Sequence, residues 1–275
     1  MGQAATKAQE AHAQAKCKPK TNKKVQEQKM KTARATGMLA LPESKLKRVP
    51  SGVLELAATL RTLDLSQNRL EELPSQINTF TSLKTLKLQS NAIAVLPDMS
   101  GLTALTTLVL DSNALQSIPN KLPPNLTKLS LRGNQLREIP ASVLALTQLK
   151  ELDLGQNALT AVPAHFGQAL PELVDLTLDD NKLQELPACL ASCSKLKVLS
   201  ARRNQLSGKR QPQSISSVIL ADSAVHIMNL EGNPMTKVEF EAMEGVEAFQ
   251  HRRTLTKNKE IHGGLSTDTS VCGLE

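Results

Sequence analysis

Leucine recurs along most of this chain in one fixed pattern of apolar and polar positions. In the copy that opens at Leu60, apolar residues follow at Leu63 and Leu65, an amide at Asn68, and a Leu-Pro pair at 73 and 74. The opening leucines lie at Leu60, Leu83, Leu105, Leu126, Leu149, Leu173 and Leu196, so successive copies start 21 to 24 residues apart. A repeat of this length predicts a solenoid of stacked, similar units.

The apolar positions within each copy predict a short strand. Leu63 and Leu65 alternate with polar residues, as in a strand with one buried face. A single copy cannot bury that face, but stacked copies can, and each buried leucine then contributes roughly 1.5–3 kcal/mol. We therefore expect an α/β solenoid shaped like a horseshoe, with a parallel sheet on the concave side and irregular or short helical segments on the convex side.

An Asn follows the strand segment of each copy. The series is Asn68, Asn91, Asn113, Asn134, Asn157, Asn181, Asn204 and Asn233. An amide that turns inward can donate to and accept from backbone groups of its own copy and the next. We therefore predict a structural role for these residues. A Pro later in most copies ends regular pairing and starts the convex return.

Degenerate copies mark both ends of the predicted solenoid, which spans residues 36–235 and contains about nine copies. Beyond it, Phe240, Met243, Val246 and Phe249 recur at three-residue steps, which predicts a capping helix over residues 236–252. Residues 253–275 are predicted to form a disordered tail. Residues 1–35, which precede the repeats, are predicted to form a disordered basic arm.

The net charge is concentrated in this arm. The chain holds 33 Lys and Arg against 26 Asp and Glu, a net charge of +7. Residues 1–35 hold nine Lys and Arg and two Glu, and the remaining 240 residues carry 24 charges of each sign. A neutral solenoid argues against a basic groove, so we expect no nucleic-acid partner.

The arm carries a lipidation signal. It begins with the residues MGQAATK, which match the N-myristoylation pattern with Gly2 as the acceptor. One myristoyl chain binds a membrane only marginally, so a second attraction is needed. The arm offers Cys17 as a candidate palmitoylation site, and lysines predicted to contact an anionic membrane surface: Lys16, Lys18, Lys20, Lys23, Lys24, Lys29 and Lys31. The alternative is a solvated basic tail with no membrane role.

The third, fifth, seventh and eighth positions of each copy are predicted to face the concave side, where solenoids bind partners. In the early copies these positions are mostly Thr, Ser and Gln, and charge enters later. We predict a partner-binding role for Lys128, Arg132, Glu151, Asp153, Asp175, Asp179, Asp180, Arg202 and Arg203. The acidic members would suit a basic or mixed-charge segment of another protein. The alternative is that neighbouring rows neutralise each other as surface ion pairs.

The sequence contains no constellation typical of an active site. Its five His are scattered, without Cys or acids at metal-ligand spacing. Cys189 and Cys193 lie four residues apart, but Cys193 takes the place of Phe80 or Leu102 in other copies, so core packing is predicted. No stretch has the length and apolar character of a signal peptide or membrane span, and four Cys without clusters fit a reducing compartment. We expect no enzyme activity, no metal and no cofactor.

Several stretches match a known family, most specifically at the two ends and in the long loop. They are the Met1-Gly2 start, residues 36–37, 60–66, 212–215 and 231–233, and the basic stretch 252–259. In these the chain resembles small intracellular members of the leucine-rich repeat family. The resemblance implies a lipid-anchored cytoplasmic protein without an assigned activity, acylated at Gly2. The basic insert around residues 16–31 departs from the short arm of that family, and it either strengthens membrane attachment or binds an acidic partner.

Together these patterns favour a non-catalytic, monomeric scaffold. We expect it to be cytoplasmic, held at a membrane by its lipid anchor, with a protein partner on the concave face. Two alternatives remain open. One is a regulatory subunit in a phosphatase, ubiquitin ligase or small-GTPase pathway. The other is an architectural component of a cytoskeletal assembly, with the basic arm on an acidic surface.

Overall fold

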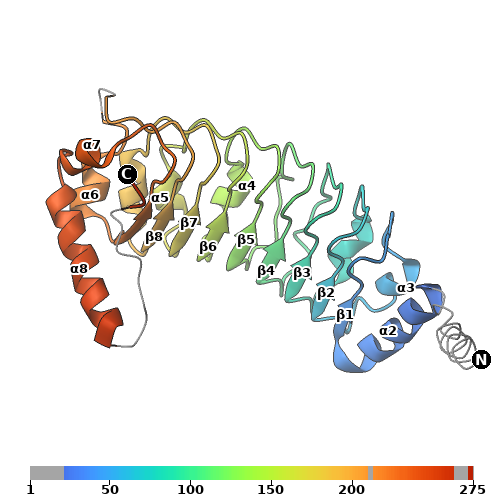
Figure 1. Cartoon of the computed structure of the whole chain (residues 1–275). Helices are drawn as coiled ribbons and strands as arrows, with labels where there is room; N and C mark the ends of the chain where they lie inside the picture. The colour runs from blue at the N-terminus through green and yellow to red at the C-terminus, as the bar shows by residue number, and fades with distance from the viewer. Residues whose placement is uncertain (1–21, 210–212, 263–271, 275) are drawn as a thin grey trace, which may run out of the picture.

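The protein folds as a curved solenoid around one parallel sheet (Figure 1). The structure is a computed structural model that describes residues 22–209, 213–262 and 272–274. Nine strands pair in chain order, each with the next: β1 Met38–Ala40, β2 Thr62–Asp64, β3 Thr85–Lys87, β4 Thr107–Val109, β5 Lys128–Ser130, β6 Glu151–Asp153, β7 Asp175–Thr177, β8 Val198–Ser200 and β9 Ile227–Asn229. The predicted parallel sheet is confirmed.

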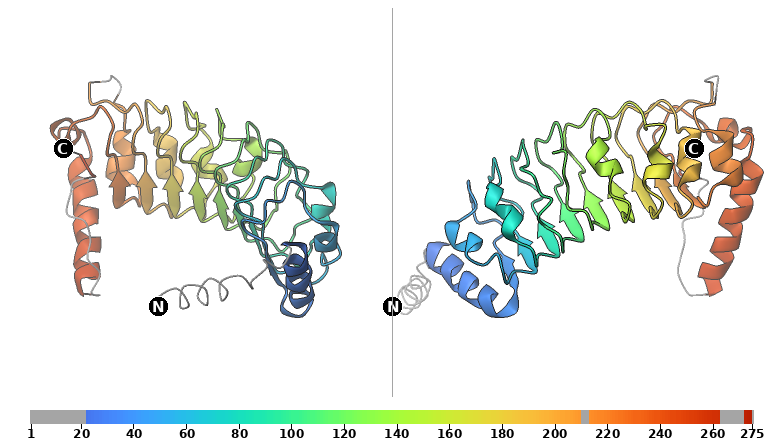
Figure 2. Two further views of the ribbon diagram at one scale, coloured as in Figure 1. Left: turned by 45° about the vertical axis from the view of Figure 1, so that its right-hand side comes forward. Right: turned by 180° about the vertical axis from the view of Figure 1, so that it is seen from behind.

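The other side of the arc holds short helices and irregular chain. Figure 2 shows the strands along the inner side and the short helices opposite them. These helices are α3 Ser51–Leu54, η1 Ser75–Thr79, α4 Ala141–Leu144, α5 Phe166–Ala169, η2 Ala188–Ser192 and α6 Ser217–Asp222. Four of them, α3, η1, α4 and η2, begin directly after a Pro, whose extended backbone redirects the chain before the helix starts.

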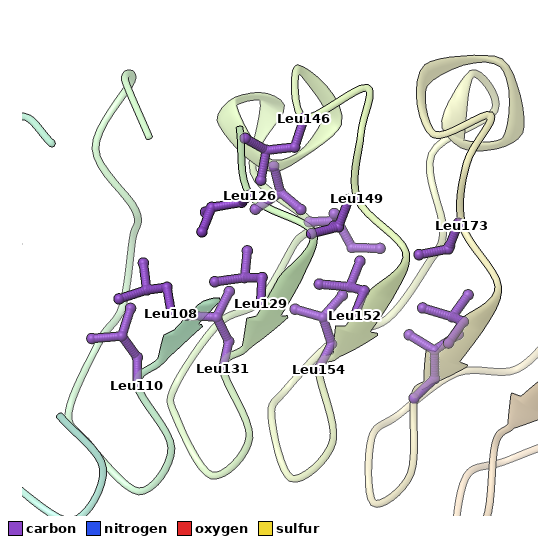
Figure 3. Packing of buried hydrophobic residues seen from close by; sticks show 14 of the residues in the cluster. Leu108, Leu110, Leu126, Leu129, Leu131, Leu146, Leu149, Leu152, Leu154 and Leu173 are labelled. Carbon is purple, nitrogen blue, oxygen red and sulfur yellow. The ribbon is translucent and has the colours of Figure 1, made fainter. Parts of the chain in front are cut away.

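Leucines from successive repeats form the core in continuous rows. In the register of the sheet, Leu108 pairs with Leu129 and Leu129 with Leu152, and all three are at most 2% exposed. Figure 3 shows these side chains in line, above a second row that includes Leu131 and Leu154. Each leucine contacts the equivalent leucine of the next repeat, so the core is as long as the solenoid.

The Asn residues bind the backbone of neighbouring repeats, as predicted. The Asn91 side-chain oxygen accepts a hydrogen bond from the Leu70 backbone N–H at 3.0 Å. Its NH₂ group donates to the Leu65 carbonyl of the preceding repeat at 3.0 Å and to the Leu88 carbonyl of its own at 2.9 Å. The same contacts recur along the solenoid, so the amides join each repeat to the one before it.

The residue before each Asn adopts a left-handed backbone. Six of these residues are not Gly, with φ between 47° and 58°: Gln67, Ser90, Ser112, Gln156, Asp180 and Arg203. This conformation costs a residue with a Cβ atom roughly 1–2 kcal/mol. Since every repeat turns at the same place, the Asn hydrogen bonds that follow the turn offset this strain.

A helix covers the N-terminal end of the core, where a disordered arm was predicted. Helix α2 runs over Asn22–Thr36 and buries Ala33 completely, while Met30 packs against the core. Its Lys29 amine donates to the Ala40 carbonyl of β1 at 3.0 Å. The prediction of disorder is therefore wrong for residues 22–35, because few apolar side chains are needed to cover one end of a narrow core. Residues 1–21 lie outside the described part of the chain.

The C-terminal cap differs from the single predicted helix over residues 236–252. Two helices form it, α7 Lys237–Glu241 and α8 Val246–His262. Thr236 and Glu239 cap α7 by hydrogen bonds to each other's backbone N–H groups. Phe240 of α7 then meets Phe249 of α8 edge to face, with ring centroids 6.1 Å apart. The predicted apolar residues do cap the core, but from two helices.

The predicted disordered tail is ordered in two parts. Helix α8 continues ten residues beyond the predicted end at residue 252. Further on, residues 272–274 return to the last repeat, where the Cys272 carbonyl accepts a hydrogen bond from Leu230 at 2.8 Å. Cys272 and Leu274 are buried there. These contacts are between residues about 40 apart in sequence, which composition alone does not reveal. Within the described ranges, no helix combines the length and apolar character that crossing a bilayer requires.

Candidate functional site

The concave face is a ladder of outward-pointing strand residues. In each strand the middle residue is buried. In most strands both flanking residues, at the predicted third and fifth positions, reach the surface, whereas Ser130 of β5 and Ser200 of β8 are buried. The sheet register places Lys128 beside Glu151 and Glu151 beside Asp175. It also places Ser130, Asp153 and Thr177 side by side in the second row. Charged side chains that are more than 20 residues apart in sequence therefore meet on β5, β6 and β7.

These three strands, together with the end of β4, line a shallow hollow of about 350 Å³. It is lined by Val109, Asp111, Lys128, Leu129, Ser130, Glu151, Leu152, Asp153, Asp175 and Thr177. Four of these residues are acidic and one is basic, so the hollow is negatively charged at neutral pH. It is part of the concave face predicted to bind a partner.

Burial raises the pKa of two carboxyl groups in the hollow. For Asp175, desolvation is the main cause, nearby Glu151 raises the pKa further, and Lys128 lowers it. For Asp153, desolvation is again the main cause, and it outweighs a hydrogen bond from the Gly155 backbone N–H at 2.8 Å. Both carboxylates are thus held in an environment that disfavours their charge.

Two other carboxylates on this face hold adjacent repeats together. Asp111 accepts hydrogen bonds from the Ser130 hydroxyl at 2.5 Å and from the Arg132 backbone N–H at 3.1 Å. Asp179 repeats this arrangement three repeats later, accepting from Ser200 at 2.6 Å and from the Arg202 backbone N–H at 2.8 Å. The signal in the sequence was an Asp at the seventh position followed by Ser-x-Arg in the next copy. Asp111 was not among the residues predicted from this signal.

The remaining charges pair along the edge of the face. Asp180 binds Arg203 through two contacts, one of them at 2.8 Å, and Arg132 at 3.4 Å. Hydrogen bonding to Arg203 is the main cause that lowers the pKa of Asp180. The Arg202 guanidinium lies 3.9 Å from Asp179 and 3.7 Å from Glu231. The crowding of Asp179 and Asp180 is thus relieved within the chain.

The structure sorts the nine predicted partner-binding residues. Six of them form ion pairs within the chain, either with Asp179 or with one another: Lys128, Arg132, Glu151, Asp180, Arg202 and Arg203. Asp179 is buried, with 7% exposure. Asp153 bonds only to a backbone N–H group, and Asp175 has no hydrogen-bond or ion-pair partner among the described residues. A binding role of these residues stays a prediction, now centred on Asp153 and Asp175.

The predicted lipid and membrane residues divide between two regions. Lys23, Lys24, Lys29 and Lys31 lie on α2. Gly2, Cys17, Lys16, Lys18 and Lys20 lie outside the described residues.

The two neighbouring cysteines are part of the core, as predicted. Cys193 is fully buried, and burial raises the pKa of its thiol to about 12. Cys189 donates to the Pro163 carbonyl at 3.3 Å. Across the described residues, no group of three or more His, Cys, Asp or Glu side chains is placed to hold a metal ion.

A parallel sheet with one strand per repeat, Leu rows in the core and an Asn row at the turn defines a leucine-rich repeat solenoid. The chain belongs to the leucine-rich repeat family, whose pattern matches residues 58–115, 124–183 and 147–206. A leucine-rich repeat protein of Leptospira interrogans of known structure covers 78% of this chain and 82% of its own, at 20% identity and a TM-score of 0.40.

Curated relatives match about half of the chain. The plant intracellular Ras-group-related LRR protein 8 of Oryza sativa subsp. japonica is 33% identical over 135 residues, covering 49% of this chain and 31% of its own length. The leucine-rich repeat and calponin homology domain-containing protein 1 of Mus musculus is 34% identical over 145 residues, covering 52% of this chain and 17% of its own. The chain thus spans less than a third of these relatives.

Proposed function

We propose that this protein is a non-catalytic scaffold that binds a basic or mixed-charge segment of a partner protein on its concave face. Leucine-rich repeat domains generally bind proteins, which supports the broad class of function. The observation that carries the specific proposal is Asp175. Its carboxylate lies half-buried in the hollow, next to Glu151 and without a hydrogen-bond or ion-pair partner among the described residues.

A Lys or Arg side chain of the partner would complete this arrangement. Its positive charge would lie between Asp175 and Glu151, which repel each other, and close to Asp153. A charge-assisted hydrogen bond in a partly desolvated hollow is stronger than one at a fully exposed site. The aliphatic part of the same side chain would pack over the apolar lining of the hollow.

A charge reversal tests this site. We expect Asp175→Lys to weaken binding of a labelled Lys-rich peptide at least tenfold by fluorescence anisotropy, and to remove the affinity-captured partner. Glu71→Lys is the matched control, since Glu71 is an exposed acid beyond the strand, after the Asn of its repeat. Equal peptide affinity for wild type and Asp175→Lys would exclude the hollow as the binding site.

We further propose that the N-terminal arm attaches the scaffold to a membrane. The support is the motif at Gly2, as at the start of leucine-rich repeat-containing protein 57, which the ends and long loop of this chain resemble. Cys17 and the lysines of the arm, which lie in the insert that departs from that family, offer the second attraction that a single myristoyl chain needs. Metabolic labelling with a clickable myristate tests the anchor. We expect wild type to be labelled and Gly2→Ala not to be, and equal labelling of both would refute the proposal.

A role in a small-GTPase pathway is the second candidate. It is supported by the rice relative, whose name describes it as Ras-group-related and whose aligned region covers half of this chain. This role is compatible with the concave hollow as the binding site. Capture on immobilised Ras-type GTPases loaded with GTP or GDP distinguishes it, because a scaffold for an unrelated basic segment would not respond to the nucleotide.

A further inference from the structure

Positive charge extends from the arm onto the folded N-terminal end of the solenoid. Residues 22–61 contain nine Lys and Arg against three Glu, a net charge of +6. Residues 1–61 together carry +9, and the rest of the chain carries −2. The neutral charge of residues 36–275 therefore combines a basic first repeat with a more acidic remainder. Basic side chains exposed at this end are Lys29, Lys31, Lys45, Lys47, Arg48 and Arg61.

Few acids neutralise this end. Of the three Glu side chains, Glu55 pairs with Arg34 of α2 at 3.2 Å. Lys29 donates to a backbone carbonyl, and the other five exposed basic side chains named above have no ion-pair partner within the described chain. Their charges therefore add to one positive surface formed by α2 and the first repeat, which we call the basic end.

The C-terminal cap shows that capping a solenoid does not require this charge. Residues 236–262 contain five basic and five acidic residues and are neutral overall. Both caps cover an open end of the same core (Figure 1), which requires only a polar outer surface. The net charge of the basic end therefore has another cause.

We propose that the basic end docks on an anionic lipid surface and that the solenoid stands end-on, with its acidic concave hollow away from the lipid. The proposal rests on the membrane attachment proposed above and extends it to folded residues. Helix α2 begins at Asn22, within the arm, so the segment of the sequence that carries the lipidation motif leads directly into the basic end. An anionic surface attracts this end and repels the hollow.

Vesicle binding of the unmyristoylated chain removes the contribution of the lipid, and a variant confined to the first repeat then isolates the contribution of the folded residues. We expect wild type to sediment with vesicles that contain phosphatidylserine and not with pure phosphatidylcholine. The variant Lys45→Glu/Lys47→Glu/Arg48→Glu should lose at least tenfold in binding, because each basic residue near an anionic surface contributes about fivefold. Lys121→Glu/Lys182→Glu/Lys237→Glu, which makes the same charge change at exposed positions away from this end, should bind within about twofold of wild type.

Hydrogen exchange on vesicles tests the orientation. We expect protection of residues 29–48 and none over residues 246–255. If the first variant binds vesicles as well as wild type does, the contact is made by the arm alone. If both variants lose binding equally, the attraction depends only on net charge. If wild type binds charged and uncharged vesicles equally, there is no electrostatic contact with the lipid. Each of these results overturns the proposal. Myristate labelling at Gly2 and peptide binding at Asp175 are read out separately, so their failure is distinguishable from this one.

Discussion

The guanidinium of Arg132 reaches the carboxylate of Asp180, 48 residues further along the chain, at 3.4 Å. It does so by passing over the intervening repeat, which has Gly155 at the corresponding position. A Cβ atom at Gly155 would lie 2.6 Å from the Arg132 guanidinium. The missing side chain thus allows an ion pair across two repeats. This ion pair lies between the acidic hollow and the ion pairs that Arg202 and Arg203 form at the edge of the face.

Gly155→Ala should displace Arg132 and weaken this pair. The backbone at Gly155 is not left-handed, so in an Arg132→Ala background the same change should stabilise the fold by about 0.4–1 kcal/mol through the unfolded chain. In the wild-type background the loss of the pair should cancel that gain, giving a coupling of about 1 kcal/mol. Urea unfolding of the four proteins measures it. Identical effects in both backgrounds would show that Arg132 does not sense the added methyl group.

Asn91→Ala should destabilise the solenoid strongly. It leaves the Leu70 N–H without an acceptor and the Leu65 and Leu88 carbonyls without this donor, at a cost of about 3 kcal/mol. Thermal unfolding by circular dichroism measures the change. The control is Asn125→Ala, an exposed amide that bonds to one carbonyl, where less than about 1 kcal/mol is expected.

Arg252→Ala should loosen the C-terminal cap. The Arg252 side chain on α8 donates to the backbone carbonyls at the end of α6, including Leu220 at 2.6 Å and Ala221 at 2.8 Å. Losing these bonds should cost about 2–3 kcal/mol, because a charged donor to buried carbonyls is strong. Hydrogen exchange should increase over residues 217–222, whereas His251→Ala, at an exposed neighbour, should leave it unchanged. Unchanged protection of α6 in Arg252→Ala would show that contacts other than those of Arg252 hold this helix in place.

Asp175→Asn should stabilise the isolated protein near neutral pH while it weakens partner binding. The pKa of Asp175 is raised in the fold, so its charged form opposes folding at pH values above the folded pKa. Replacing it should add up to about 1 kcal/mol at pH 7. The gain should shrink as the pH falls through the folded pKa and vanish below the unfolded value of about 3.9. Unfolding by urea at pH 7 and pH 3 measures both. A gain that persists at pH 3 would show that charge is not its cause.

The repeat pattern predicted the solenoid because the same leucine is buried in every copy, so local spacing and tertiary packing carry the same information. The Asn row was predictable for the same reason, since each amide bonds to backbone at a fixed offset. Helix α2 was not, because its buried face consists of little more than Met30 and Ala33. Two apolar residues are too few to reveal a helix by periodicity in a segment that otherwise consists mainly of charged and polar residues.

The sequence was enough to predict which residues lie on the concave face, but not which of them contact one another. Alternation along each strand placed Asp175 and Asp179 on the outside of the predicted strand segment, and both were assigned to partner binding. In the structure Asp179 accepts hydrogen bonds from Ser200 and Arg202 of the next repeat, whereas Asp175 has no hydrogen-bond or ion-pair partner among the described residues. The difference depends on which side chain the neighbouring repeat presents within reach.

The sequence by itself determined the period, the parallel sheet, the buried Leu and Asn rows and the concentration of positive charge toward the N-terminus. These follow from spacing, because a repeated unit meets a copy of itself. Only the tertiary structure decided which charges are paired, where the acidic hollow lies, and that the basic arm continues as a helix onto the first repeat. These depend on distances between side chains of different repeats, which are 20 or more residues apart in the chain and a few ångströms apart in the fold.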